Sequence, residues 1–290
     1  MRETSARIAR SSQKPLGVVL DRIPRVVAQP RLSLECTPVS AAATAARTRI
    51  LPNGLFDLLR QLAIWFGFLW AYRYTRGVAD RDSYEAFQNG LRVADVEHRL
   101  TGLWELSLQS LVMSSGLLRE LTSWTYWHSQ FTVLGLVMLW VYLRRNESFV
   151  RFRNTLLLAN LIGLAGFVLA PTAPPRLFPE LGFVDTLAGF GINHDSAIVR
   201  ADANPYAAMP SLHAADALIV GVGLFFVVRT QWLRFLWLLW PVWVWFAVMA
   251  TGNHFWLDIL AGIVVAAVAG AVVNHKYLRR RFARPRPVPA

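Results

Sequence analysis

The sequence contains one cysteine, Cys36, among its 290 residues. A single cysteine excludes an intrachain disulfide and a metal cluster built from cysteines. A convincing secretory signal is also missing. Asp21, Arg22, Pro24 and Arg25 interrupt the first apolar stretch, whereas a signal peptide needs an unbroken apolar core of roughly 7–15 residues. We therefore expect neither disulfide-based stability nor a cleaved leader.

Acidic residues are scarce: 18 Asp and Glu stand against 30 Lys and Arg, which gives a formal net charge of +12. Hydrophobic residues make up 54% of the chain, a proportion typical of membrane proteins with several spans rather than of soluble domains. The positive charge gathers at the termini and beside the apolar runs, as expected for contact with anionic cytoplasmic lipid. No nucleic-acid-binding module is recognisable, so we expect anionic lipid, and no nucleic acid, at the basic tails.

Six apolar runs are long enough to cross a bilayer, since each has about 18–20 residues and roughly 20 residues span the hydrocarbon core. We predict spans at about 56–75, 125–143, 154–171, 211–229, 232–251 and 256–274. The stretch 102–118 is apolar but carries Glu105 and Gln109, which indicates an interfacial or partly buried amphipathic helix. The predicted fold is all-α: a polytopic membrane helix bundle with six transmembrane helices plus an amphipathic interfacial helix.

Four groups of basic residues fall on one side of the membrane if all six runs cross. They are Arg47 and Arg49; Arg144, Arg145, Arg151 and Arg153; Arg229 and Arg234; and Lys276, Arg279, Arg280, Arg281, Arg284 and Arg286. The positive-inside rule makes this side cytoplasmic. We expect an integral membrane protein of the plasma membrane, with both termini in the cytoplasm and the motifs described next on the outer face.

The chain divides into three predicted parts. Residues 1–50 are rich in Pro, Ser, Thr and Arg and predict a basic, disordered cytoplasmic arm. Residues 51–275 contain the six runs, show no convincing internal repeat and predict one six-helix membrane domain. Residues 276–290 predict a polybasic cytoplasmic tail.

A histidine and an aspartate stand four residues apart in TGNHFWLDILAG, at the mouth of the last run: His254 and Asp258. Residues four apart share one face of a helix, so the carboxylate can hold one ring nitrogen and leave the other free and more basic. That arrangement suits a histidine nucleophile or base. Asn253 belongs to the turn before the pair. A structural His–Asp pair that caps the helix is the alternative reading.

A second motif, NPYAAMPSLHAADA, predicts a helix that starts near Ser211. His213 would lie in its first turn, where the helix N-terminus favours an anion such as phosphate. An interfacial histidine at the top of a span is the plainer reading. Asp216 follows one turn later, where it could orient His213 or pair within the bundle.

A third motif, APTAPPRLFP, places Arg176 among prolines that stiffen the exit from a span. A guanidinium binds phosphate oxygens in bidentate fashion, although an ordinary interfacial arginine would look the same. His213, His254 and Asp258 could also hold zinc. However, no H-E-x-x-H pattern is present, and a nearby arginine and helix N-terminus suit an anion better, so we expect no metal and no cofactor.

The order of the three motifs resembles the type 2 phosphatidic acid phosphatase superfamily. The forms APPR, PSLHA and GNHFWLDILAG look most like its inositolphosphotransferase branch, typified by fungal inositol phosphorylceramide synthase. The resemblance covers roughly residues 120–275, including five of the predicted spans.

The resemblance implies a role for each motif residue. His254 would be the nucleophile that takes the phosphoryl group, and Asp258 would orient it and stabilise its charge. His213 would protonate the leaving group and then act as base on the incoming water or alcohol. Arg176 and Ser211 would bind the phosphate.

Two phosphate-binding cations of the phosphatase members are missing here. Those members carry a Lys before an Arg-Pro pair in the first motif, whereas no Lys lies between Lys14 and Lys276. They also carry an Arg six residues before the nucleophilic His, where this chain has Val248. A phosphodiester carries one negative charge and a monoester up to two, so fewer cations favour a diester donor, unless a loop arginine such as Arg200 substitutes.

We predict a membrane phosphotransfer enzyme that acts through a phosphohistidine. Transfer of an inositolphosphate-type headgroup from a phospholipid to an alcohol is preferred, and hydrolysis of a lipid or polyprenyl phosphate is the alternative. A non-catalytic transporter or lipid-binding protein is an alternative of another class, but it should carry ionisable groups near the bilayer midplane rather than at helix mouths. The sequence indicates no oligomeric state.

Overall fold

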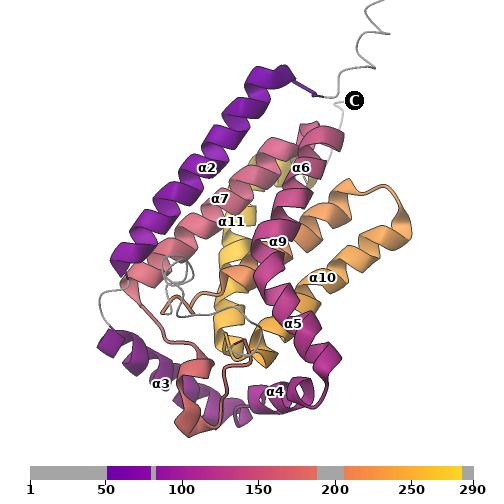
Figure 1. Ribbon diagram of the computed structural model, residues 1–290. Helices are drawn as coiled ribbons and strands as arrows, with labels where there is room; N and C mark the ends of the chain where they lie inside the picture. The colour runs from indigo at the N-terminus through magenta and orange to yellow at the C-terminus, as the bar shows by residue number, and fades with distance from the viewer. Residues whose placement is uncertain (1–50, 80–82, 188–205, 283–290) are drawn as a thin grey trace, which may run out of the picture. The chain divides into compact units, whose positions relative to one another are not determined.

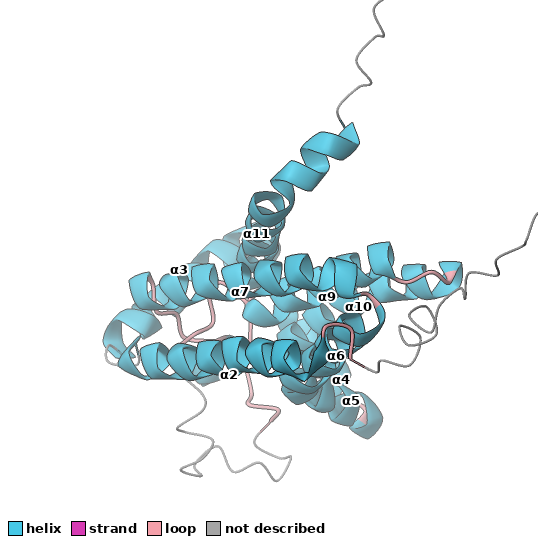
Figure 2. Cartoon of the chain, turned by 90° about the horizontal axis from the view of Figure 1, so that it is seen from above, coloured by secondary structure: helices cyan, strands magenta, loops and turns pink. Residues whose placement is uncertain are grey.

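The computed structural model describes residues 51–79, 83–187 and 206–282. Within these ranges the chain consists of helices joined by loops and turns (Figure 2), so the all-α prediction is confirmed there. The predicted arm, 1–50, and the end of the basic tail, 283–290, lie outside the described residues.

Nine α-helices make up the described part of the chain. They are α2 (Gly54–Ala79), α3 (Ser83–Thr101), α4 (Glu105–Met113), α5 (Gly116–His128), α6 (Leu134–Arg144), α7 (Asn146–Leu169), α9 (Leu212–Val227), α10 (Gln231–Ala250) and α11 (Trp256–Phe282). A π-helical turn, Ser129–Val133, joins α5 to α6, and two short 3-10 turns follow α7.

Three described helices are long and apolar enough to cross a membrane: Asn146–Leu169, Gln231–Ala250 and Trp256–Tyr277. The runs predicted at 154–171, 232–251 and 256–274 fall on them. The run predicted at 211–229 forms α9, a shorter apolar helix. The runs predicted at 56–75 and 125–143 fall within α2 and within the continuous α5–α6 helix.

The largest apolar core lies between α6, α7, α9 and α11. Its fully buried members include Val141, Leu156, Ala215 and Ala269. Figure 1 shows α7 and α11 running along the bundle, while α3 and α4 lie together at one end of it. Since α9 packs on α7, α10 and α11, its first residues are held between neighbouring helices.

The predicted single helix over 102–118 is wrong. The chain leaves the helical conformation at Ser115, which is extended at φ −132° and ψ 118° and accepts a hydrogen bond from the Leu118 N–H as an N-cap. A serine at this position competes for backbone donors and starts a new helix. The stretch therefore forms α4 and the beginning of α5, and α5 runs on through the π-helical turn into α6.

A second apolar cluster joins α3 to the loop that follows α7 and to the start of α11. It contains Phe178, Phe183 and Phe255, which are almost completely buried. Gly90 on α3 allows this contact, because a Cβ there would lie 2.7 Å from both the Ala173 carbonyl oxygen and the Phe178 ring. The helices at this end of the bundle thus form a platform beneath the motif residues.

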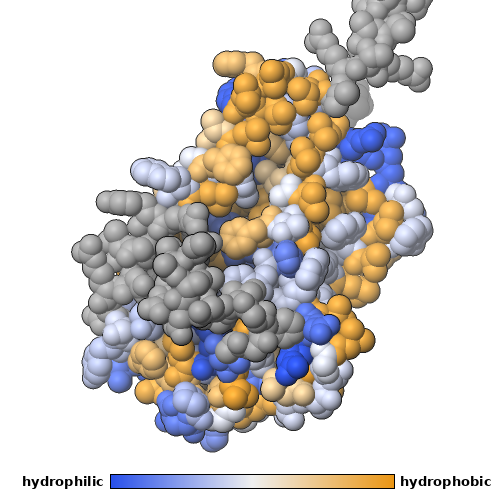
Figure 3. Space-filling view, viewed as in Figure 1, coloured by the Kyte–Doolittle hydropathy of each residue, from blue (hydrophilic) through white to orange (hydrophobic). Residues whose placement is uncertain are grey.

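Large apolar side chains are exposed along the outer faces of α2, α6, α10 and α11. Examples are Phe66, Leu136, Leu239 and Val264. Figure 3 shows apolar surface over the upper ends of α2 and α6. Long apolar helices with outward apolar faces are those of a protein surrounded by lipid.

The close contact between α9 and α11 depends on Gly262, because a Cβ there would overlap the carbonyl oxygen of Ser211. We predict that Gly262→Ala lowers Tm in detergent by several degrees, since forcing extra volume into a packed contact costs about 1–3 kcal/mol. Gly270→Ala, two turns further along α11, is the matched control. A Cβ at Gly270 meets nothing within 4 Å, and alanine is the better helix former by about 1 kcal/mol. Equal Tm values for the two variants would contradict the proposed contact.

Candidate active site

The first turn of α9 carries Ser211 and His213. Ser211 is the N-cap, with its hydroxyl accepting a hydrogen bond from the Ala214 N–H at 3.3 Å, so the predicted helix start is confirmed. His213 is the second residue of the helix and is half-buried. Its ring therefore lies at the positive end of the α9 dipole.

The first turn of α11 carries Asp258 as its third residue. One carboxylate oxygen, Oδ2, accepts a hydrogen bond from the Phe255 N–H at 2.9 Å, the backward half of a capping box. The same oxygen lies 3.4 Å from Nδ1 of His254, and both side chains are buried. The carboxylate is therefore beside one ring nitrogen of the histidine and locked in place by the helix backbone.

The starts of α9 and α11 are joined directly. The Ser211 N–H donates to the carbonyl oxygen of Asp258 at 2.9 Å. The ring centroids of His213 and His254 are 5.8 Å apart, with 59° between the ring planes. Two histidines from separate motifs thus face the same small region.

The loop after α7 places the backbone of Arg176 against the turn that precedes His254. Its backbone N–H donates to the carbonyl of Gly252 at 2.8 Å, which fixes the arginine against the turn before His254. Its Nε is 3.9 Å from Oδ2 of Asp185, and the side chain is 13% exposed. A guanidinium held loosely by one carboxylate keeps donors for a second anion.

The turn before His254 has little room. Gly252 has φ +70°, and a Cβ there would lie 2.9 Å from the Gln109 amide nitrogen. Glycine is therefore needed both for the backbone conformation and for the lack of space. Gln109 exchanges two hydrogen bonds with the backbone of Val184, at 2.9 and 3.0 Å. Asn253, a candidate site residue, donates to Thr251, so its amide nitrogen serves the turn.

Sequence reasoning missed Tyr126. Its ring stacks on that of His213, with centroids 4.7 Å apart and planes 21° apart. His128, two residues later, instead contacts Thr132 through Nδ1 at 3.0 Å. No motif in the sequence marks either residue. The π-helical turn that follows both of them shifts the phase between this segment and the apolar run of α6, so the pattern of α6 does not show which of the two faces the bundle.

Asp216 pairs with side chains of neighbouring helices. Its oxygens accept hydrogen bonds from Asn160 at 2.8 Å and from Gln130 at 3.4 Å. Of the two roles that the sequence left open, pairing within the bundle therefore has direct contacts in the structure. Arg200, offered as a substitute cation, lies outside the described residues.

The candidate zinc ligands are His213, His254 and Asp258. Across the described residues, no group of three or more His, Cys, Asp or Glu side chains is arranged to hold a metal ion. The Arg176 backbone is bound to the turn before His254, and His213 lies in the first turn of α9. An arginine and a helix N-terminus suit an anion.

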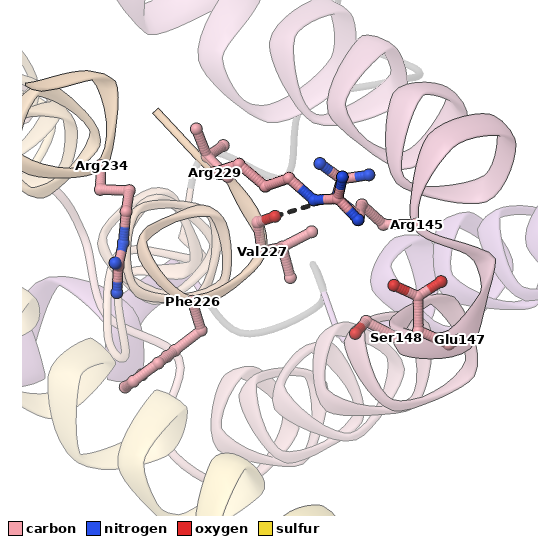
Figure 4. A pocket seen from close by; sticks show the side chains of 8 residues that line it. Arg145, Glu147, Ser148, Phe226, Val227, Arg229 and Arg234 are labelled. Atoms are coloured by element: carbon pink, nitrogen blue, oxygen red, sulfur yellow. Dashed lines mark hydrogen bonds between the residues drawn. The ribbon is translucent and has the colours of Figure 1, made fainter. Parts of the chain in front are cut away.

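A cavity of about 350 Å³ lies at the opposite end of α9 from His213 (Figure 4). It is lined by Arg145, Glu147, Ser148, Phe226, Val227, Val228, Arg229 and Arg234. Arg145 and Arg234 donate through Nε to the Val227 and Phe225 carbonyls, at 3.0 and 2.7 Å. These arginines therefore cap the C-terminus of α9, about 24 Å from its start at 1.5 Å per residue.

Comparison with known proteins agrees with the motif pattern. The profile of the PAP2 superfamily matches residues 91–272, more than half of the chain. This chain belongs to the PAP2 superfamily. A phosphoinositol dihydroceramide synthase from Bacteroides thetaiotaomicron is 30% identical over 152 residues, covering 48% of this chain and 50% of the relative. The chain thus matches about half the length of that curated relative, and no solved structure matches it significantly.

These findings confirm the predicted family and its likeness to the inositolphosphotransferase branch. Together with the apolar helices, they make the protein an integral membrane member of a lipid phosphatase and phosphotransferase family.

Val248, at the position where phosphatase members carry an arginine, is fully buried in an apolar cluster of α9, α10 and α11. Its carbonyl accepts hydrogen bonds from the N–H groups of Asn253 and His254.

Proposed function

We propose that the protein transfers a phosphorylated headgroup, of the inositolphosphate type, from a phospholipid to an alcohol. The transfer runs through a covalent intermediate on His254. The observation that carries the proposal is the meeting of His254, Asp258 and His213 at the joined starts of α9 and α11. A nucleophile, its orienting carboxylate and a second histidine are the groups that two successive displacements at phosphorus require.

In the first displacement, the free ring nitrogen of His254 attacks the phosphorus of the donor and the bond to the lipid oxygen breaks. His213 gives a proton to that oxygen, so the lipid leaves as an alcohol. Asp258, 3.4 Å from Nδ1, stabilises the positive charge that the imidazole gains. His254 then carries the phosphorylated headgroup.

In the second displacement, the acceptor alcohol attacks the same phosphorus. His213, now neutral, takes the alcohol proton, and the bond from phosphorus to His254 breaks. Both histidines return to their starting states, so the cycle balances without a metal ion or an organic cofactor. An alcohol acceptor gives a new phosphodiester, and water would give a phosphate monoester instead.

The phosphate itself would be bound by Arg176 and by the N-terminal end of α9, where Ser211 is the cap. One guanidinium and one helix terminus provide modest positive charge. Because Val248 occupies the position of a further cation, this charge suits a singly charged diester better than a doubly charged monoester. The name of the Bacteroides thetaiotaomicron relative, a phosphoinositol dihydroceramide synthase, also supports transfer of a phosphorylated headgroup.

The proposed topology has six spans, both termini in the cytoplasm and the histidine site on the outer face of the plasma membrane. It is supported by the three candidate spans and by the arginines at the far end of α9, which the positive-inside rule places in the cytoplasm. A donor lipid would enter sideways from the outer leaflet. The histidines lie at helix starts, unlike the midplane ionisable groups of a transporter.

We predict that His254→Ala lowers turnover by a factor of about 10³ or more, and that His213→Ala lowers it by about 10²–10⁴. Purified protein in detergent would receive phospholipid donors, sphingolipid-like and other alcohols, and polyprenyl phosphates, in the presence of EDTA. Mass spectrometry would follow new lipids and free phosphate. His275→Ala, at the distal end of α11, is the matched control and should keep wild-type turnover.

A new phosphodiester lipid that the His254→Ala protein does not make would support the transferase. Release of phosphate alone would replace it with the phosphatase. Wild-type turnover by folded His254→Ala protein would contradict the assigned nucleophile.

We predict that Tyr126→Ala lowers kcat by about two- to tenfold, because an aromatic pair contributes about 0.5–1.5 kcal/mol. Loss of the stacked ring frees His213 to rotate. Tyr126→Phe keeps the ring and should retain wild-type kcat. If both variants lost activity equally, the phenol hydroxyl rather than stacking would be responsible.

A further inference from the structure

Two glutamates outside the sequence motifs are completely buried beneath the start of α11. Glu97 lies in the last turns of α3, and Glu105 is the first residue of α4; neither has any exposed surface. Lys, Glu, Arg and Asp are almost never fully buried unless they are paired. The pair formed by Glu97 and Glu105, called the carboxyl pair below, therefore needs a physical explanation.

Each member of the carboxyl pair binds a backbone N–H in the first turn of α11. Oε1 of Glu97 accepts from the Leu257 N–H at 2.7 Å, and Oε1 of Glu105 accepts from the Trp256 N–H at 3.1 Å. These N–H groups have no partner within their own helix. Together with Asp258, which accepts from the preceding N–H, three carboxyl groups saturate the start of α11.

The second oxygen of each carboxyl is left without a partner. Oε2 of Glu97 and Oε2 of Glu105 are both buried and have no donor partner among the described residues, although the two carboxyl groups lie within hydrogen-bonding reach of each other. A carboxylate can only accept, whereas a protonated carboxyl can also donate. One proton on the carboxyl pair would let one carboxyl group donate a hydrogen bond to the other.

The surroundings also favour a retained proton. Burial raises the pKa of Glu97, and the nearby carboxyl groups of Glu105 and Asp258 raise it further, against the lowering effect of the Leu257 N–H. Within the described residues, neither member of the carboxyl pair has a cationic partner. Like-charged carboxyls at one site commonly hold one proton between them.

Among the described residues, ionisable groups close to the carboxyl pair in space or in sequence include members of α11 and of α3. At the start of α11 they are Asp258 and His254, which contact each other. On α3, His98 and Arg99 follow Glu97 in sequence but are exposed. Thr101, at the end of α3, accepts a hydrogen bond from the Trp256 indole at 3.2 Å, so the end of α3 and the start of α11 are joined by side chains as well.

We propose that Glu97 and Glu105 are positioning residues that share one proton and hold the first turn of α11, so that Asp258 and His254 face the reacting phosphate. The activity readout of this inference rests on the proposed function. Loss of the shared proton would place two charges beside Asp258, remove the donor between the two carboxyl groups and repel a phosphate. Turnover should therefore fall on the alkaline side as the proton leaves.

The raised pKa of Glu97 determines how its proton affects folding stability as pH changes. The folded protein holds this proton more tightly than the unfolded chain does, so its contribution to stability is complete at low pH. That contribution decreases as pH rises from the ordinary Glu value, about 4.3, towards the raised value in the folded protein.

The test compares Glu97→Gln with Glu97→Ala in the full-length protein. Glutamine keeps an acceptor for the Leu257 N–H and a permanent donor for Glu105, so we expect near wild-type kcat at neutral pH and no alkaline decline from this group. Alanine removes both contacts, and we expect kcat to fall by about ten- to a hundredfold with little change in KM, as for a misplaced catalytic group. Glu120→Ala, which removes an exposed glutamate of α5, is the control.

Wild-type kcat in the Glu97→Ala protein would overturn the positioning role. An alkaline decline that is the same in wild type and Glu97→Gln would overturn the role of the shared proton. If Glu97 contributed only to the structure, Glu97→Ala would lower activity, whereas Glu97→Gln would have the same pH profile as the wild type.

A second measurement does not depend on turnover. The infrared difference spectrum of wild type minus Glu97→Gln should show, at neutral pH, the C=O stretch of a protonated carboxyl, and this band should disappear as pH rises. Its absence at neutral pH would overturn the shared proton even if the enzyme is active. If the wild type had no His254-dependent turnover, the proposed function would fail while this band still tested the carboxyl pair.

Discussion

The hydrogen bond from the Ser211 backbone to the Asp258 carbonyl is the contact on which the site depends. It joins the first turns of two helices whose motifs are more than forty residues apart in sequence. Because Gly262 leaves no side chain between them, the two helices approach closely enough for the imidazoles of His213 and His254 to face each other. A displacement of either helix start would separate the two proton-transferring groups.

The two helix starts differ in how their backbone donors are used. At α11, carboxyl groups of Glu97, Glu105 and Asp258 accept from successive N–H groups, so the protein itself occupies that terminus. At α9, Ser211 caps a single N–H through its hydroxyl. The positive end of α9 therefore remains the better place for a phosphate, while α11 provides a fixed base for the nucleophile. In the proposed reaction, α9 binds the phosphate and α11 positions the nucleophile, His254.

Much of the fold and of the site can be predicted from the sequence because the signals are local. Apolar length identifies the helices that match the candidate spans, a serine before an apolar run identifies the start of α9, and the four-residue spacing brings Asp258 next to His254. Contacts between distant segments leave no such signal. Glu97, Glu105 and Tyr126 lie far from the motifs in sequence, and the break at Ser115 divides a stretch whose apolar character appears continuous. The position of Glu105 within an apolar stretch is the indication that the sequence does provide.

The central claim is that His254 carries the phosphorylated headgroup during turnover. The most direct measurement is to incubate purified protein with a phospholipid donor labelled in its headgroup phosphate, without acceptor, and to quench at alkaline pH. Peptide mapping then locates the label. We expect an acid-labile, alkali-stable label on the peptide that contains His254, absent from His254→Ala and retained in His275→Ala. Turnover with no label on His254, or with label on another residue, would contradict it.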